Sequence, residues 1–116
     1  MPLVFKVLFF QMLSTTALAL SVEPDSVFVR IIDTGPGLAE LIVLPDNQYI
    51  IYDTGHWNAE RLVMGRVREL IPECSVIELL VQSHSDADHV SSTEHILERY
   101  HVKRVLRTGL ERQTTT

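Results

Sequence analysis

The middle of the chain holds the apolar stretch Val76-Ile77-Glu78-Leu79-Leu80-Val81, followed after Gln82 by the polar run Ser83-His84-Ser85-Asp86-Ala87-Asp88-His89. A short apolar run of this kind is typical of a buried strand. The polar run places several side chains that can bind a metal directly after that strand. Open α/β sheets hold their ligand sites beyond the carboxyl ends of their strands, so this stretch predicts a strand that ends in a functional loop.

Other apolar, β-branched runs on both sides of this stretch predict further strands. Pro45-Asp46-Asn47-Gln48 has the residue types of a hairpin turn and joins two of them. The strands are expected at residues 27–32, 39–44, 49–52, 76–81 and 102–106.

Two stretches between these strands carry helix signals. Asn58 is expected to cap a helix that runs to about Ile71. Ser91 and Glu94 fit a capping box for a second helix, which ends near Tyr100. Trp57 is expected to pack as a hydrophobic staple before the first helix, with a place at a substrate mouth as the alternative. Strands that alternate with helices predict an α/β fold with a mixed β-sheet.

Length and composition limit the classes of protein that fit. The chain has 116 residues, 46% of them hydrophobic, and a formal net charge of -5. These values suit one small domain with a core. The acidic balance argues against a protein that binds nucleic acid non-specifically through phosphate contacts. The single cysteine, Cys74, excludes an internal disulfide and a multi-cysteine zinc finger, and we expect it to be a buried thiol.

Residues 1–19 have the pattern of a secretory signal peptide. Lys6 precedes a mostly apolar stretch, and Ala17-Leu18-Ala19 is a typical cleavage signal, with Ser21 as the second choice. We therefore expect export to the periplasm or the extracellular space, with no stable membrane association once the segment is cleaved. The alternative is an uncleaved segment that anchors the chain in a membrane.

Four metal-binding side chains fall within six positions of the polar run: His84, Asp86, Asp88 and His89. Imidazole and carboxylate groups are the ligands that zinc uses in hydrolytic sites. The cluster could hold two metals, one on His84 and Asp86 and the other on Asp88 and His89. Two ions about 3.5–4 Å apart can share a water and lower its pKa. The alternative is a solvated polar loop in which an aspartate caps a turn.

Residues 79–90 resemble the metal-binding motif H-x-[H/E/D]-x-D-H of the metallo-β-lactamase superfamily. More narrowly, they are similar to the hydrolase domain of the competence protein ComEC/Rec2 group. Residues 31–39 resemble the opening F-I-D-V-G-Q-G-D-A of that group, and residues 49–55 resemble its I-L-I-D-T-G strand end. The resemblance covers about residues 27–110. It implies that residues 20–116 form the first half of a metallo-β-lactamase αββα sandwich, which is incomplete without its second half.

The resemblance also implies roles for individual residues. His84 and Asp86 would hold a first metal, and Asp88 and His89 a second, with Asp88 also orienting the attacking hydroxide. Asp53 would brace the ligand loop by hydrogen bonds from beside the site. Asp33 would have a structural role in the preceding turn. The two divalent ions are expected to be zinc, although Asp86 stands where the family more often has histidine, which favours manganese or iron.

The expected function is that of a metal-dependent hydrolase. A metal-bound hydroxide would attack an ester-like or phosphodiester-like centre, and the substrate, a small molecule or a nucleic acid, is left open. Because the later ligands of the family lie in its second half, the alternative is a non-catalytic fragment or a half domain that needs a partner to supply the rest.

A minor alternative comes from the tripeptide Asp-Thr-Gly, which occurs at residues 33–35 and 53–55. In aspartic proteases, a loop of this sequence supplies one carboxylate of a catalytic pair that shares a proton. Each such loop needs its own β lobe, and the helix expected after Asp53 does not fit an all-β fold.

Overall fold

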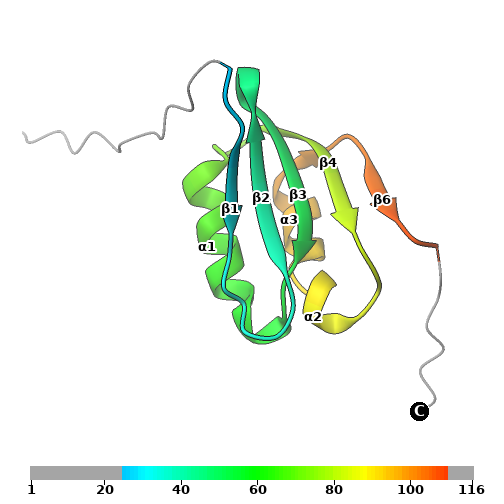
Figure 1. Cartoon of the computed structure of the whole chain (residues 1–116). Helices are drawn as coiled ribbons and strands as arrows, with labels where there is room; N and C mark the ends of the chain where they lie inside the picture. The colour runs from blue at the N-terminus through cyan, green and yellow to red at the C-terminus, as the bar shows by residue number, and fades with distance from the viewer. Residues whose placement is uncertain (1–24, 110–116) are drawn as a thin grey trace, which may run out of the picture.

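A mixed six-stranded β-sheet organises the computed structural model, which describes residues 25–109 (Figure 1). Its main path runs β1-β2-β3-β4-β5, and β6 also pairs with β4. The first three strands are antiparallel, while β4 is parallel to β3, β5 and β6. The strands are β1 (Phe28–Ile31), β2 (Ala39–Leu44), β3 (Gln48–Thr54), β4 (Val76–Gln82), β5 (His101–Val102) and β6 (Val105–Arg107). The predicted α/β class with a mixed sheet is confirmed.

The strand predicted at 102–106 is in fact two short strands. Lys103 and Arg104 interrupt the pairing, yet their backbones still bond to β4: Lys103 N–H donates to the Ile77 carbonyl at 2.9 Å, and Leu80 N–H donates to the Arg104 carbonyl at 2.9 Å. The chain therefore kinks along the edge of β4 without leaving it.

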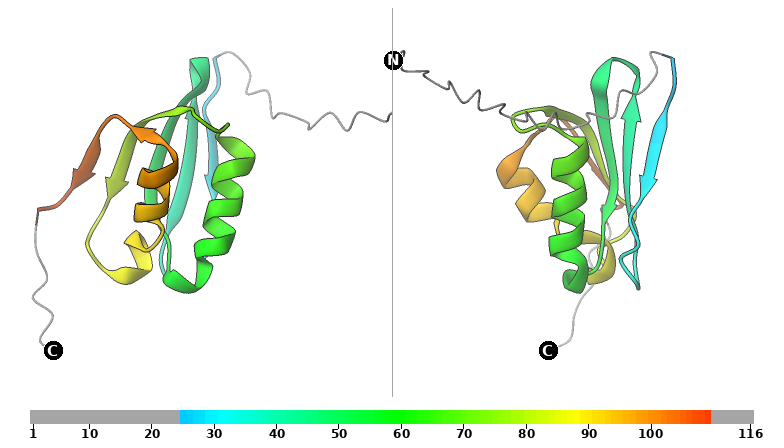
Figure 2. Two further views of the ribbon diagram at one scale, coloured as in Figure 1. Left: turned by 180° about the vertical axis from the view of Figure 1, so that it is seen from behind. Right: turned by 90° about the vertical axis from the view of Figure 1, so that its left-hand side faces the viewer.

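Helices α1 and α3 lie on one face of the sheet, and α2 lies at the end of β3 and β4 (Figures 1 and 2). The α-helices are α1 (Glu60–Leu70), α2 (Ala87–Val90) and α3 (Thr93–Arg99), and the 3-10 turns are η1 (Pro45–Asn47) and η2 (Trp57–Ala59). Helix α1 follows β3, and α2 and α3 follow β4, so each crossover returns the chain to a parallel strand.

Several local predictions around the helices are wrong. The residue before α1 is Ala59, and the residue before α3 is Ser92; neither makes a side-chain capping bond. Asn58 lies inside η2 instead, and its N–H donates to His56 Nδ1 at 3.1 Å. Trp57 is 62% exposed, so it does not act as a staple. In each case the 3-10 turn or the preceding helix carries the chain into the new helix, and no side-chain cap is needed.

Cys74 is also not where the sequence placed it, because its side chain is exposed. It lies in the turn after α1, in which Ser75 N–H donates to the Pro72 carbonyl at 3.1 Å. Its backbone has a φ of 64°, the left-handed conformation of a tight turn. This turn places the Cys74 thiol at the surface and not in the core.

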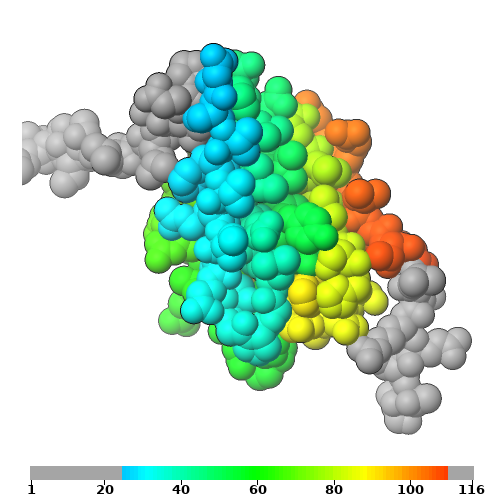
Figure 3. Space-filling view, in the orientation of Figure 1, coloured from blue at the N-terminus to red at the C-terminus, as the bar shows by residue number. Residues whose placement is uncertain are grey.

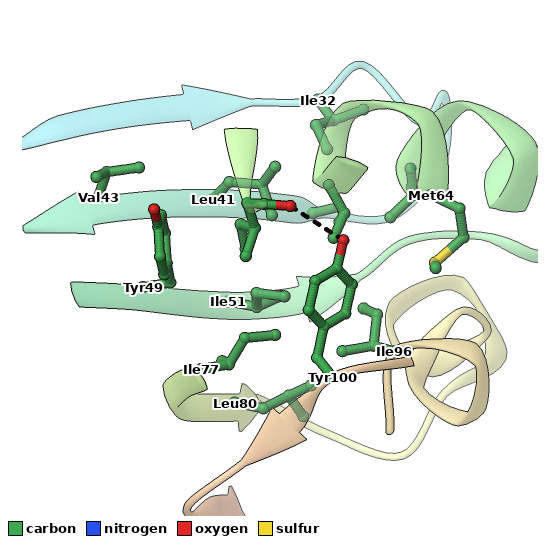
Figure 4. Packing of buried hydrophobic residues seen from close by; sticks show 14 of the residues in the cluster. Ile32, Leu41, Val43, Tyr49, Ile51, Met64, Ile77, Leu80, Ile96 and Tyr100 are labelled. Atoms are coloured by element: carbon green, nitrogen blue, oxygen red, sulfur yellow. Dashed lines mark hydrogen bonds between the residues drawn. The ribbon is translucent and has the colours of Figure 1, made fainter. Parts of the chain in front are cut away.

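The core lies between the sheet and the helices (Figure 4). Leu41, Ile51 and Leu80 of neighbouring strands belong to one core cluster with Val63 and Val67 of α1, and all five are almost fully buried. Burying such side chains contributes about 1.5–3 kcal/mol each.

Tyr100 closes this core at the end of α3. Its hydroxyl donates a hydrogen bond to the Ile71 carbonyl at 3.1 Å, which ties the end of α3 to the end of α1. Desolvation by burial raises the pKa of this hydroxyl above its ordinary value. The neutral, hydrogen-bonded form is therefore the form that suits the core.

The opposite face of the sheet is largely apolar, and none of the helices among residues 25–109 covers it (Figures 2 and 3). Directly paired residues share a face, so the strand register defines two rows across the sheet. The two rows are Val29-Ile42-Ile50-Leu79 and Ile31-Glu40-Tyr52-Val81-Leu106. Ile31 is 66% exposed and Leu106 58% exposed at the two ends of the second row. We call these two rows the open sheet face.

The predicted signal peptide, residues 1–19, lies outside the described residues, as does the chain after residue 109. Within residues 25–109, none of the helices has the length and apolar character required to cross a bilayer.

Candidate metal centre

The predicted site residues gather at one edge of the sheet, where the parallel strands β3 and β4 both end (Figure 1). Asp53 is the next-to-last residue of β3, and Ser83 and His84 directly follow β4. The chain then enters α2, which carries Asp88 and His89. The end of β3, the loop after β4 and the single-turn helix α2 therefore supply the whole cluster.

Asp53 is fully buried, with an exposed fraction of 0%. Its Oδ1 accepts a hydrogen bond from Ser83 N–H at 2.8 Å, and its Oδ2 accepts from Ser83 Oγ at 2.5 Å and from His89 Nδ1 at 2.8 Å. A buried carboxylate requires such donors to replace the water it has lost. Asp53 also has a φ of 55°, which is unusual for a residue other than glycine and costs about 1–3 kcal/mol. Its hydrogen bonds hold the residue in this conformation.

The rings of His84 and His89 lie beside each other, with their centroids 3.9 Å apart. Each ring directs its Nε2 at an aspartate: His84 Nε2 lies 3.9 Å from Asp86 Oδ2, and His89 Nε2 lies 3.5 Å from Asp88 Oδ2. The side chain of His89 is 17% exposed and that of His84 43%. His89 is thus the inner histidine and His84 the outer one.

Two groups of side chains among the described residues could hold a cation. In one, ligand atoms of His84, Asp86 and Asp88 all lie within 4.8 Å of one another. In the other, the same holds for Asp53, His84 and His89. We favour the first group, because the oxygens of Asp53 are already engaged by three donors.

The donor set of the first group fits a divalent ion. One imidazole and two carboxylates suit zinc, and the predominance of oxygen also suits manganese or iron. The structure brings three of the four sequence-predicted ligands into this group, with His89 beside it through Asp88. Asp88 therefore lies with both histidines, whereas the sequence paired it with His89.

Helix α2 is a feature that the sequence analysis missed, since it predicted a loop throughout the polar run after the strand. The helix has four residues, so it leaves no apolar periodicity to detect. His89 N–H donates to the Asp86 carbonyl at 3.0 Å, and Ser91 Oγ donates to the Ala87 carbonyl. Asp86 precedes the helix but makes no side-chain capping bond to it.

A small hydrogen-bond network that contains two threonines holds the backbone of His89 in place. Thr54 Oγ1 donates to the His89 carbonyl at 3.3 Å and lies 3.0 Å from Thr93 Oγ1. Gln82 Nε2 donates to Thr93 Oγ1 at 3.0 Å. A threonine hydroxyl carries one proton, so Thr93 donates to Thr54 while it accepts from Gln82. These hydrogen bonds fix the position of α2 on the end of β3.

Asp33 lies in the turn after β1 and is exposed. Its Oδ1 accepts a hydrogen bond from Gly35 N–H at 3.1 Å, which is the local contact of an Asx turn. The same loop reaches the cluster through Gly37, whose φ is 99°. A Cβ at this position would lie 1.9 Å from the Asp88 carbonyl oxygen. The loop therefore packs directly against the backbone of a candidate ligand.

Ser83 and Gly37 are the two contributors that the sequence analysis missed. Ser83 precedes His84 at the end of a strand, and this position was the only signal of its contact with Asp53. Gly37 gave no signal, since its contact with Asp88 joins residues far apart in the chain. His95 lies away from the cluster on α3, where its Nε2 is 3.1 Å from Glu60 Oε1.

The geometry does not favour the aspartic protease. Asp53 is hydrogen-bonded to Ser83 and His89, Asp33 is exposed in its own turn, and helices cover one face of the sheet.

Comparison of the chain with protein-family models, curated proteins and solved structures finds no match. The fold and the cluster together define an α/β protein with a candidate metal centre at the carboxyl edge of its sheet.

Proposed function

We propose that the chain is a metal-dependent hydrolase of the metallo-β-lactamase type. The observation that carries this proposal is the group of His84, Asp86 and Asp88, whose ligand atoms lie within 4.8 Å of one another at the ends of β3 and β4. A divalent ion bound there would supply Lewis acidity and a nucleophile at neutral pH. The motif in which these residues occur supports the same assignment.

The residues of the chain would divide the work as follows. His84 and Asp86 from the loop after β4 and Asp88 from α2 would hold the ion. The carboxylate of Asp88 would also orient a nucleophile and accept a proton beside the ion, and its Oδ2 lies 3.5 Å from His89 Nε2. Asp53 holds the inner histidine by its Nδ1 and keeps the ligand loop on the end of β3. His89 would complete a second site with Asp88.

The substrate is proposed to be an ester or a phosphodiester, either a small molecule or a nucleic acid. The net charge of -5 offers no general attraction for a polyanion, so the local ion would have to provide it. The proposal includes export, which the pattern of residues 1–19 supports.

Metal binding and turnover test the proposal separately. The full chain is titrated calorimetrically with Zn²⁺ and Mn²⁺, and then assayed with bis(para-nitrophenyl) phosphate and para-nitrophenyl acetate. We expect binding and metal-dependent turnover that the double variant His84→Ala, His89→Ala abolishes. His95→Ala is the matched control, because His95 pairs with Glu60 away from the cluster. Turnover that survives the double variant would contradict the proposal.

A second candidate function is favoured by the open sheet face: a half domain that is inactive without a partner. An uncovered apolar face is unusual, because a sheet face that is left in water normally carries polar side chains. This candidate predicts that the chain binds the metal but shows no turnover, and that a dye such as ANS binds the open sheet face. Robust turnover by the isolated chain would exclude it.

A further inference from the structure

Ser83 lies between the buried carboxylate and the outer histidine. Its Oγ is 2.5 Å from Asp53 Oδ2 and 2.8 Å from His84 Nδ1. Its backbone N–H also donates to Asp53 Oδ1 at 2.8 Å. The residue therefore contacts the carboxylate at two points and the ring of a candidate ligand at a third.

Counting protons fixes the direction of these bonds. An ionised carboxylate only accepts, and a serine hydroxyl has one proton to give. At 2.5 Å from Asp53 Oδ2, the Ser83 hydroxyl must donate to it, because two unprotonated oxygens would repel each other at this distance. The hydroxyl is then free only to accept from His84. The proton of the neutral His84 ring must therefore lie on Nδ1, which leaves the lone pair on Nε2.

The inner histidine, His89, is expected to have the same tautomer, but no hydroxyl group lies between it and Asp53. His89 Nδ1 lies 2.8 Å from Asp53 Oδ2 and donates to it directly. Its lone pair is therefore also on Nε2. Both Nε2 atoms face the aspartates of the cluster, His84 toward Asp86 at 3.9 Å and His89 toward Asp88 at 3.5 Å. The protons of both rings lie on the side of Asp53, away from the place where an ion would bind.

We propose that Ser83 is a positioning residue that sets the tautomer of His84, so that Asp53 prepares both histidines to bind a metal through Nε2. Asp53 acts on His89 directly and on His84 through the Ser83 hydroxyl. The inference rests on the proposed function only in its metal-binding consequence, since the tautomers belong to the chain itself. Partners that orient ligands in this way typically change metal affinity by about 10- to 100-fold.

The test measures the ring nitrogens of both histidines by NMR on the full chain without metal, at about pH 8.5, where unperturbed imidazoles are neutral. The variants are Ser83→Ala, which removes the hydroxyl, and Ser83→Thr, which keeps it. We expect the Nδ1–H form of His84 in the wild type and in Ser83→Thr, and a gain of the Nε2–H form in Ser83→Ala. His89 is the internal control, because its bond to Asp53 bypasses Ser83.

Metal affinity provides the second measurement. Ser83→Ala should weaken Zn²⁺ or Mn²⁺ binding by about 10- to 100-fold, and Ser83→Thr should restore it to within about threefold of the wild type. An equal loss in both variants would overturn the proposal, since a merely structural role of the side chain would give that result. A His84 tautomer that does not respond to Ser83→Ala would overturn it as well.

The outcomes separate this inference from the proposed function. If the wild type binds no metal but the His84 tautomer depends on the Ser83 hydroxyl, the role proposed for Ser83 is supported and the proposed function fails. If the metal binds while wild-type His84 is protonated on Nε2, the role proposed for Ser83 is wrong and the proposed function stands. If Ser83→Ala does not fold, the wild-type tautomer still tests the proposal, because a proton on His84 Nδ1 supports it and a proton on Nε2 overturns it.

Discussion

The tripeptide Asp-Thr-Gly occurs twice in this chain, and its two copies have different environments. Asp33 follows the edge strand β1, is exposed, and accepts a hydrogen bond from Gly35 within its own turn. Asp53 is the next-to-last residue of the interior strand β3, is fully buried, and accepts three hydrogen bonds from Ser83 and His89. The same three residues thus form a turn in one place and the base of a candidate site in the other. The neighbouring parallel strand, which only the second copy has, makes the difference.

The two copies also touch each other. A Cβ on Gly55 would lie 2.8 Å from Thr34 Cγ2. Gly55 N–H donates to the Leu38 carbonyl at 2.8 Å, and the Gly55 carbonyl accepts from Ser91 N–H at 3.2 Å. The first copy therefore packs against the second, and the second against the segment after α2. Substitutions at matched positions of the two copies can break or sharpen this comparison.

The largest difference is expected between the two aspartates. Asp53→Ala should lower the free energy of unfolding by about 3–5 kcal/mol, because three hydrogen-bond donors lose their buried, charged acceptor. Asp33→Ala should lower it by about 0.5 kcal/mol, as is usual for a surface position. Urea unfolding measures both values. Similar losses in the two variants would show that burial does not distinguish the copies.

The next effect is expected at Gly37, which continues the first copy. Gly37→Ala should cost about 3 kcal/mol and weaken metal binding, since its Cβ would meet the Asp88 carbonyl at 1.9 Å and force the ligand backbone to move. Gly35→Ala is the control: Gly35 has the same left-handed backbone, but a Cβ there meets nothing within 4 Å. It should cost about 1 kcal/mol and leave metal affinity unchanged. Equal metal affinity in the two variants would argue against the packing of this loop on Asp88.

A smaller effect is expected at Gly55. Gly55→Ala should cost about 2 kcal/mol, because its Cβ would meet a methyl group of Thr34 that can partly give way. Gly35→Ala again controls for the backbone strain. Combining Gly55→Ala with Thr34→Ser, which removes that methyl group, should recover part of the loss. Thermal unfolding of the two single variants and the pair measures this coupling.

The smallest difference is expected between the two threonines. Thr54→Val should cost about 1–2 kcal/mol, because the His89 carbonyl and the Thr93 hydroxyl both lose a buried partner. Thr34→Val should cost about 0.5 kcal/mol, since Thr34 Oγ1 makes only a long bond of 3.4 Å to the Pro36 carbonyl. Urea unfolding again gives both values. A larger loss in Thr34→Val would reverse the order of the two copies.

The sequence predicted the strands better than the helix ends. The apolar runs gave β2 its observed bounds and placed β1, β3 and β4 within two residues. Strand pattern is visible because alternate residues face a core. The start of α1 was misplaced because Trp57–Ala59 forms a 3-10 turn, for which the sequence has no recognisable pattern. Helix α2 is a single turn held by contacts with β3, and such contacts join residues distant in sequence.

The candidate site was predicted in its residues but not in its arrangement. His84, Asp86, Asp88 and His89 were chosen because they cluster in the chain. Their grouping depends on α2, which turns Asp88 toward His84 and Asp86. The contact of Ser83 with Asp53 spans 30 residues and requires the pairing of β3 with β4. A pattern in one stretch of sequence cannot show such a pairing.

The closeness of the four candidate ligands in the sequence has a consequence for folding thermodynamics. Ligands within six consecutive positions can chelate an ion even in the unfolded chain. An ion stabilises a protein only by the difference between its affinities for the folded and unfolded states. On the proposed function, the rise in melting temperature on adding metal would therefore be smaller than the affinity of the folded chain suggests. The part of the affinity that does favour folding would come from Asp53 and Ser83, which act on the ligands only when β3 and β4 are paired.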